Sequence, residues 1–287
     1  EIGVRLVGSE MCIRDSPSGG IRSVAKAIYQ VAKSQGVDFF FNQPVKKISI
    51  NGNKATEVVT DKSSYHADII VANADYNHVE QTMLPKAYRN YSKSYWAKRT
   101  MSPSALIFYV ALNKKLDLSH HALFFDSDFK KHAREIYDHP KWPDEPLFYT
   151  SCVSKTDPNV APENGEALFI LIPVAPNLVD NEQTRKSYFQ QVISRMELLI
   201  NQDIKDHIVF SKSYAHRDFI SDYNSFQGNA YGLANTLFQT AFLKPKIKNK
   251  KINNLYYTGQ LTVPGPGMPP SIVSGKIVAD QIKIETK

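Results

Sequence analysis

The sequence has little cysteine and no long apolar run. Its two cysteines, Cys12 and Cys152, are too few for a disulfide framework and lack the spacing of metal ligands. No stretch approaches the roughly 18 apolar residues that a membrane-spanning helix needs, and the longest apolar runs, such as residues 103–112, have the length of a strand. We therefore expect a reducing compartment, no metal site and no membrane span, although attachment to a membrane surface stays open.

The sequence also lacks internal repeats and low-complexity linkers. A chain of 287 residues, 42% of them hydrophobic and 22% charged, can bury a sizeable core and suggests about two domains. Acidic residues are outnumbered, 28 against 35 lysines and arginines, which gives a net charge of +7. This surplus suits nucleic acid, an anionic lipid surface or an anionic cofactor, and charge alone does not choose among them.

Residues 1–16, EIGVRLVGSEMCIRDS, differ from the rest because they show no secretory pattern, no sustained period and no helix cap. The segment VGSEMCIRDS resembles a translated adaptor artefact of sequencing projects, so we exclude residues 1–16 from functional reasoning. An ordinary N-terminal strand and loop is the alternative. On the first interpretation the native chain begins mid-protein near Pro17, and its N-terminal part is missing.

Residues 19–36 predict a helix that packs on a sheet, because apolar side chains recur with helical spacing and Gly36 follows as a C-cap. A strand, VDFFF, is expected next. A β-meander with turns at Asn51–Gly52 and Asp61–Lys62 then returns to the core through residues 69–71. The apolar face of the helix consists of Ile21, Val24, Ala25, Ile28, Val31 and Ala32.

The middle of the chain is different in kind. Residues 77–100 are predicted to be helical and combine basic with aromatic side chains, and a long loop rich in Asp, His, Pro and Trp precedes residue 147. Residues 181–200 predict an amphipathic helix with an apolar inward face. That face includes Tyr188, Val192, Met196 and Leu199. Strands are predicted at residues 105–112, 147–153, 167–174 and 207–214.

The stretch YYTGQLTVPGPGMPPSIVSGKIVAD, residues 256–280, places glycines and prolines between a short strand and a helix. Prolines are tolerated in the first turn of a helix, and glycines let a backbone come close to a ligand. Ser274, Gly275 and Ala279 make one flank of the helix small. The stretch therefore suits a loop that aims the positive end of a helix at a ligand. A Pro-Gly-rich surface turn is the alternative, because glycine-rich loops are weak indicators by themselves.

This stretch resembles the C-terminal flavin-binding motif of the bacterial-type phytoene desaturases, FAD-dependent carotenoid desaturases within the amine-oxidase-like flavoprotein superfamily. Other blocks agree in order and spacing: PSGGIRSVAKAIYQVAKSQGV with NQPVKKI, IIVANADYNHVEQTMLP, TDPNVAPENGEALFILIPV, and RDFISDYNSFQGNAYGLANTLFQTAFLKP. The resemblance covers essentially everything after residue 16. It implies a mixed α/β fold, in which a substrate domain with a mixed β-sheet and helices interrupts an FAD-binding Rossmann-like domain.

The resemblance also implies domain boundaries. Residues 17–76 and 253–287 would belong to the FAD-binding domain, and residues 77–252 to the substrate domain. A fold of this kind opens with a G-x-G-x-x-G turn, and no such motif occurs in the sequence. We therefore expect this chain alone to bind FAD poorly and to be inactive.

The resemblance assigns FAD contacts to one strand residue and to the C-terminal loop. Val45 would meet the adenine ring, and Gly259 the ribityl and pyrophosphate region. Gln260 would hydrogen-bond the ribityl hydroxyls, since an amide can serve there. The loop would follow the isoalloxazine edge, and the helix that begins near Pro269 would stabilise the negative charge of the reduced flavin. The loop residues concerned are Gly265, Pro266, Gly267, Met268 and Pro269.

The reaction implied is desaturation of phytoene toward lycopene. An unactivated hydrocarbon has no acidic proton to remove and needs a hydride acceptor, which the flavin provides. We therefore assign no catalytic side chain, and regard His78, His120, His121, Asp218 and Asp222 as scattered polar residues. The candidates for a substrate tunnel are Tyr223, Phe226, Tyr231, Leu237 and Phe238, for which plain core packing is the alternative.

A long apolar polyene substrate suggests a cytoplasmic protein bound peripherally to a membrane. The stretch YRNYSKSYWAKR interleaves basic and aromatic residues, as lipid interfaces favour, although a solvated helix face with buried aromatics fits equally. Two rival functions remain. One is another carotenoid desaturase, an isomerase or an amine-oxidase-like flavoprotein, and the other is a non-enzymatic basic binding module. The lysine run KPKIKNKK lies in one loop without a nucleic-acid-binding fold, so we expect no nucleic acid partner. The oligomeric state is not indicated.

Overall fold

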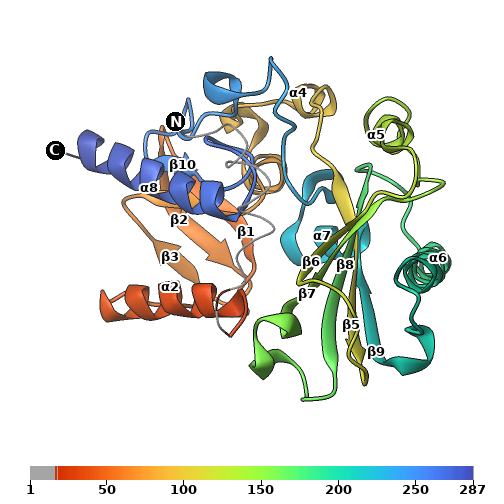
Figure 1. Ribbon diagram of the computed structural model, residues 1–287. Coiled ribbons are helices and arrows are strands. Elements are labelled where there is room, and N and C mark those ends of the chain that lie inside the picture. The colour runs from red at the N-terminus through yellow and green to blue at the C-terminus, as the bar shows by residue number, and fades with distance from the viewer. Residues whose placement is uncertain (1–16, 18, 287) are drawn as a thin grey trace, which may run out of the picture. The chain divides into compact units, whose positions relative to one another are not determined.

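The computed structural model describes residue 17 and residues 19–286, and its ribbon is drawn in Figure 1. The expectation about residues 1–16 lies outside the described residues. Contacts between Cα atoms divide the chain into two compact units. Of the described residues, the first unit combines those up to residue 38 with residues 103–218, and the second combines residues 39–102 with 219–286. The domain boundaries implied by the sequence stay a prediction.

The second unit contains an antiparallel meander of three strands, β1 (Val45–Asn51), β2 (Lys54–Thr60) and β3 (Ser64–His66). The first turn lies at residues 52–53, one residue later than predicted, with Gly52 at a φ of +59° that favours glycine. The turn at Asp61–Lys62 is confirmed.

A separate parallel pair joins β4 (Ile70–Ala72) to β10 (Leu255–Tyr257), two segments far apart in the sequence. Ile70 is buried, whereas Val71 is 44% exposed. The expectation that residues 69–71 all return to the core is therefore wrong for Val71, because successive side chains of a strand point to opposite faces. Helix α8 (Met268–Glu285) follows β10 and confirms the predicted helix with prolines in its first turn.

Residues 76–97 form short helical turns rather than one helix. They are α3 (Tyr76–His78), the π-helical η1 (Val79–Met83), the 3₁₀-helical η2 (Lys86–Tyr88) and α4 (Lys93–Ala97). Tyr76, Trp96 and Tyr257 are among the most deeply buried side chains of the second unit. The aromatic residues of this basic segment therefore build much of the core.

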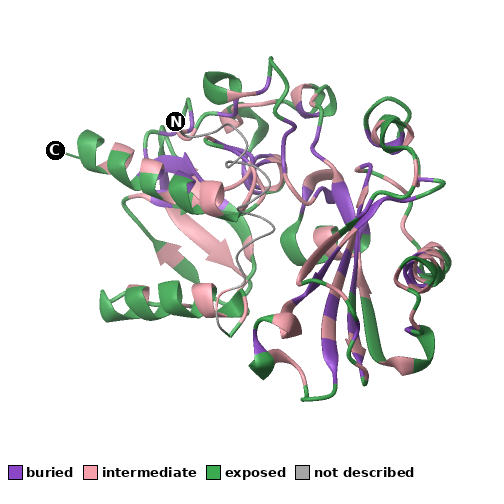
Figure 2. Ribbon diagram, in the orientation of Figure 1, coloured by how far each residue is buried: buried purple, intermediate pink, exposed green. Residues whose placement is uncertain are grey.

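The first unit contains a five-stranded sheet in the order β6, β7, β8, β5, β9, with every neighbouring pair antiparallel. Along β8 buried and half-buried residues alternate, which is the period of a strand with one face on a core. Figure 2 shows this alternation in the colours of the sheet. The strands are β5 (Ser104–Leu112), β6 (His121–Phe124), β7 (Phe148–Cys152), β8 (Glu166–Val174) and β9 (Ile208–Tyr214).

Two helices accompany this sheet, α5 (Phe129–Tyr137) and α6 (Glu182–Ile200). Val192 and Met196 of α6 are buried in the core of the sheet, as predicted, and Tyr188 packs against it. Leu199 is 50% exposed, so its prediction as an inward residue is wrong. Helix α7 (His216–Tyr223) follows β9.

Two expectations near the N-terminus are wrong. Helix α2 (Arg22–Ser34) forms, and Gly36 adopts the predicted left-handed conformation, but no residue of α2 is buried. Ile28 and Val31, on its apolar face, are 52% and 62% exposed. Residues 37–41 are not a strand, because their backbone pairs with no described strand, although the Phe40 ring packs against Tyr65 of β3.

No helix in residues 19–286 is both long and apolar enough to cross a membrane.

Candidate functional site

A cavity of about 540 Å³ lies within the second unit, where β4 and β10 end. Because the two strands are parallel, their carboxyl ends meet at one edge of the pair, where open α/β sheets commonly bind ligands. The cavity is lined by Asn73, Ala74, Asp75, Tyr76, Phe219, Asp222, Tyr223, Asn224, Ser225, Asn229, Ala230, Thr258, Gly259, Gln260, Leu261 and Ser271.

Gly259 begins the loop between β10 and α8 at this cavity. Its φ of +100° is unfavourable for a side chain, and its N–H donates to the Ser274 hydroxyl of α8 (2.8 Å). A Cβ at Gly259 would lie 3.5 Å from Asn73 Oδ1, an oxygen that also accepts from the Thr258 hydroxyl (2.7 Å). Sequence reasoning missed Asn73 and Thr258, which fix the start of the loop.

The backbone of Gly232 packs closely against the backbone of Gln260. A Cβ at Gly232 would lie 2.9 Å from the Gln260 carbonyl oxygen, so only glycine fits beside it. Asn229 Oδ1 accepts from the Gly232 N–H (2.6 Å) and, more weakly, from Gln260 Nε2 (3.4 Å). The Gln260 side chain is half-buried at the cavity, where it can still reach a hydroxyl group.

Asp75 is a carboxylate of the cavity wall that sequence reasoning missed. It caps α3 by accepting from the His78 N–H (2.9 Å), and it also accepts from the Phe226 N–H (3.1 Å). Burial raises the pKa of Asp75, although the backbone hydrogen bonds partly oppose this. Both oxygens are therefore used to shape the cavity wall. An Asp directly before a helical turn is the sequence signal that could have located it.

The loop predicted to follow the isoalloxazine edge lies beyond the cavity lining. Gly265 and Gly267 have φ angles of +135° and +108°, and Gly267 precedes α8 without a side-chain cap. Pro269 in the first turn of α8 has no N–H to donate. Gly265, Pro266, Gly267, Met268 and Pro269 are absent from the lining, so their contact with a cofactor stays a prediction.

Lys244 lies beside this loop and was not singled out from the sequence. It is 2% exposed, and its ammonium group has no hydrogen-bond partner in the described part of the chain. Burial lowers its pKa. A Cβ at Gly265 would lie 3.1 Å from Lys244 Cε and 3.2 Å from Nζ. The loop therefore packs directly against a buried amino group that has no hydrogen-bond partner among the described residues.

The remaining predicted contacts are dispersed. Val45 pairs with Thr60 at the start of the meander and is not among the cavity residues. Tyr223 lines the cavity and is 64% exposed, whereas Phe226 packs against Trp96 with ring centroids 6.0 Å apart.

Leu237 and Phe238 are 78% and 76% exposed, and Tyr231 is half-buried outside the lining. Of the five tunnel candidates, Tyr223 alone lines the described cavity at β4 and β10, and the tunnel stays a prediction.

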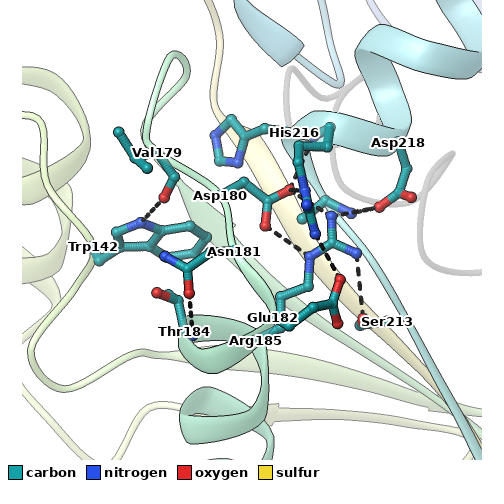
Figure 3. A network of polar contacts seen from close by, with 12 residues as sticks. Trp142, Val179, Asp180, Asn181, Glu182, Thr184, Arg185, Ser213, His216 and Asp218 are labelled. Carbon is teal, nitrogen blue, oxygen red and sulfur yellow. Dashed lines mark hydrogen bonds and ion pairs between the residues drawn. The ribbon is translucent and has the colours of Figure 1, made fainter.

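A second polar cluster, in the first unit, has a structural role (Figure 3). Arg185 of α6 forms ion pairs with the buried Asp180 (2.5 Å) and with Asp218 of α7 (2.7 Å). Burial would raise the pKa of Asp180, but hydrogen bonds from Arg185 and the Arg217 backbone outweigh it and lower the pKa. The cluster ties the start of α6 to the start of α7. Asp218 thus contributes to the packing of this cluster.

Comparison with known proteins places the chain among flavoproteins. Residues 3–283 match the family described as flavin containing amine oxidoreductase. A carotenoid 3,4-desaturase from Haloarcula japonica is 36% identical over 267 residues, covering 93% of this chain and 54% of the relative. A 1-hydroxycarotenoid 3,4-desaturase from Flavobacterium sp. is 30% identical, with the same two coverages. A zeta-carotene-forming phytoene desaturase from Myxococcus xanthus is 26% identical and covered to 52%. The chain thus spans about half the length of the curated relatives it matches.

Solved structures share the fold at much lower identity. An oxidoreductase from Methanosarcina mazei superimposes with a TM-score of 0.62 at 15% identity, covering 93% of this chain and 55% of that chain. A triple mutant of putrescine oxidase gives a TM-score of 0.57 at 13% identity, covering 92% and 53%. The mixed α/β fold expected from the sequence is therefore confirmed.

Proposed function

Because this chain belongs to the family of flavin-containing amine oxidoreductases, we propose that it forms part of an enzyme that desaturates carotenoids with FAD as the hydride acceptor. The observation that carries this proposal is the likeness of 93% of the chain to proteins named carotenoid desaturases. The cavity at the ends of β4 and β10 supports it, since it offers backbone and amide groups to a ligand.

The residues around the loop suit a flavin. Gly265 and Gly267 hold conformations that only glycine adopts easily, so the backbone can come close to a ring. The unpaired ammonium of Lys244 beside Gly265 can face an electron-rich group. We expect Gly259, Gln260 and residues 265–269 to hold the cofactor, with Val45 at its adenine. A bound flavin supplies the hydride acceptor that an unactivated C–H bond requires.

The chain's own task is to hold a long apolar substrate and exclude water. In the first unit, the face of the sheet opposite its hydrophobic core carries apolar side chains that could contact such a substrate. Cross-strand partners share a face, and pairing places Tyr149 opposite Leu171, and Leu171 opposite Ile107, in one row. Tyr109 and Phe169 form the next row, with ring centroids 5.6 Å apart. We propose that these apolar rows contact the polyene.

Phytoene is the substrate that the sequence motif favours. A second candidate is the 3,4-bond of a further desaturated carotenoid, because the relatives at 36% and 30% identity bear that name. Both reactions use the same hydride acceptor, so the site geometry alone does not choose between them. Other members of the superfamily remain the broader alternative.

Pigment analysis separates the two substrates. We expect a full-length protein that contains this chain to desaturate phytoene in a host that accumulates it. Desaturation only in a host that accumulates lycopene would favour the 3,4-reaction. Unchanged pigments in both hosts would contradict a carotenoid desaturase. We further propose that residues 17–287 alone bind FAD weakly, because they contain no G-x-G-x-x-G turn.

We also propose that the enzyme works on an anionic membrane surface, where a polyene substrate dissolves. Hydrogen bonds join two basic stretches of the second unit. Lys250 N donates to Asn90 Oδ1 (2.7 Å), and Lys246 N donates to the Tyr91 hydroxyl (3.1 Å). The exposed lysines of these two stretches, residues 86–99 and 244–251, are Lys86, Lys93, Lys98, Lys246, Lys250 and Lys251.

The segment 237–243 supplies apolar side chains for the same surface. Leu237, Phe238 and Phe242 are 76–79% exposed. Gln239 between them exchanges hydrogen bonds with the Thr100 backbone (3.0 and 2.8 Å), which follows the first basic stretch. Exposed apolar groups next to lysines are the composition that inserts at an anionic lipid interface. Trp96 is fully buried and takes no part.

A further inference from the structure

Lys244 carries a charge that the fold does not balance. Only 2% of the residue is exposed, and its Nζ has no hydrogen-bond partner among the described residues. Burying a cation without a partner is costly. A buried ammonium group without a partner is therefore better explained by a ligand that is anionic or electron-rich than by a role in the fold.

The neighbouring lysines are accommodated differently. Lys248 pairs with Glu285 (2.5 Å), and Lys251 donates to the Ala87 carbonyl (2.5 Å). Lys246 is exposed to solvent. Each of these lysines is therefore paired or solvated, whereas Lys244 is neither.

The ammonium lies against the loop that precedes α8. At Gly265 a Cβ would come within 3.2 Å of Lys244 Nζ, so the glycine makes room for the charge. Gly265 itself is buried and has a φ of +135°. Lys244 and Gly265 therefore form one local arrangement within the second unit.

The start of α8 supplies fewer donors than its sequence position suggests. Pro269 and Pro270 lack an N–H, and the Ser271 N–H already donates to the Gly267 carbonyl (3.0 Å). Among the first four residues of this helix, Met268 alone has an N–H group left to face a ligand. Negative charge at the loop thus needs another positive group, and Lys244 is placed to provide it.

We propose that Lys244 is a cofactor-binding residue whose ammonium balances the negative charge that the flavin ring gains on reduction. The inference rests on the proposed function, because it requires a flavin at this loop. A charge near the flavin ring tunes the balance between its oxidised and reduced forms. Lys244 would accordingly favour the reduced form, and the chain without flavin would carry the cost of an unpaired charge.

The test compares wild type, Lys244→Met and the control Lys246→Met, each made in a full-length protein that contains this chain, by urea unfolding and flavin binding. Without ligand, we expect Lys244→Met to raise the unfolding midpoint, since it replaces an unpaired charge with an apolar side chain of similar length. Lys246→Met should leave the midpoint unchanged. With reduced FAD under anaerobic conditions, wild type should bind about tenfold more tightly than Lys244→Met. Oxidised FAD should separate the two variants much less.

Several results would overturn the proposal. A lower unfolding midpoint for Lys244→Met would mean that the ammonium stabilises the fold itself. An equal loss of affinity for oxidised and reduced FAD in Lys244→Met would place Lys244 at the phosphates instead of the ring. A rise in the unfolding midpoint of wild type with inorganic pyrophosphate alone would do the same. Failure of wild type to bind either form of FAD would count against it as well.

These outcomes are independent of the carotenoid. A preference for reduced FAD that depends on Lys244 would stand even if pigment analysis rejected carotenoid desaturation. Conversely, desaturated pigments with an unaltered flavin preference in Lys244→Met would remove this inference and leave the proposed function intact.

Discussion

Glu80 is a fully buried carboxylate in the core of the second unit. It accepts hydrogen bonds from the backbone N–H groups of Asn90 (2.6 Å) and Tyr91 (3.0 Å), and from the Tyr257 hydroxyl (3.3 Å). Burial raises its pKa to about 7, against an ordinary value of 4.5. The residue therefore links the segment after α3 to strand β10 and makes the stability of this core depend on pH.

The sign of that dependence follows from proton binding. Between pH 4.5 and 7 the folded chain retains a proton on Glu80 that the unfolded chain has released. The contribution of Glu80 to the free energy of unfolding is thus largest below pH 4.5. It falls by up to about 3 kcal/mol as pH rises to 7, and is constant above.

We expect Glu80→Gln to remove this slope and to lower stability at pH 5 by about 1–3 kcal/mol, because one backbone donor loses its acceptor. Urea unfolding between pH 5 and 8 measures both effects, with the exposed Glu163→Gln as the control. A slope that persists in Glu80→Gln would show that another group causes it.

At the residue scale, sequence reasoning located positions with unusual backbone requirements. Gly259, Gly265 and Gly267 lie in the stretch whose glycines were predicted to let the backbone approach a ligand, and all three have positive φ angles. Lys244 was missed, because in the sequence it is one lysine of a basic run and only the fold buries it. Asn73 was missed for a similar reason, since its partner Thr258 lies 185 residues away.

At the scale of elements, the contact between residue 232 and residue 260 should be intolerant of any side chain. Gly232→Ala would place a Cβ 2.9 Å from the Gln260 carbonyl oxygen at a φ of +79°. We expect a loss of about 3 kcal/mol in unfolding free energy, from backbone strain and overpacking.

The matched control for that substitution is Gly275→Ala in α8, where nothing lies within 4 Å of the added Cβ. It should stabilise the chain by about 0.5–1 kcal/mol through helix propensity. Both values come from urea unfolding of the purified chain. Similar effects of the two substitutions would refute the close approach.

The junction of α6 and α7 depends on one arginine. Arg185→Met should destabilise the first unit by about 3–5 kcal/mol, because it leaves the buried Asp180 without its partner. Arg217→Met on the same network should cost less than about 1 kcal/mol, since its ion pair with Glu182 is exposed and its Nε lies 3.9 Å from the Asp180 carboxylate. Equal losses in the two variants would argue against a buried ion pair.

The strands and long helices of the first unit could be predicted because their apolar periods are strong, as in β8 and α6. Strand β6 and helix α5 were not, since both lie in a polar segment interpreted as a loop. Residues 37–41 show the opposite error. Their apolar run is typical of a strand, but strand formation also needs a neighbour, which a local pattern does not reveal.

At the scale of the whole molecule, membrane attachment gives a direct prediction. We expect the protein to sediment with vesicles that contain phosphatidylserine and to be released by salt, because each lysine near such a surface contributes about 1 kcal/mol. Replacing Phe238 and Phe242 with serine should lower the bound fraction. Leu198→Ser, at an equally exposed apolar position in the first unit, should not. Binding that ignores salt and lipid charge would contradict this account.

The overall architecture was predictable because five ordered blocks resemble one superfamily, and the mixed α/β fold is confirmed by solved structures. The arrangement of the cavity was not. It depends on the pairing of β4 with β10, which lie 185 residues apart, and on the close approach of Gly232 to Gln260. Such long-range contacts follow from packing and not from local sequence patterns.

The central proposal is that this chain forms part of an enzyme whose flavin takes a hydride from a carotenoid. The most direct measurement is anaerobic mixing of phytoene in vesicles with an FAD-loaded, full-length protein that contains this chain, followed by flavin absorbance and product analysis. We predict loss of the oxidised flavin band, with one new carbon–carbon double bond formed for each flavin reduced. Oxidised flavin that persists while phytoene, and lycopene in a parallel reaction, remain unchanged would contradict the account.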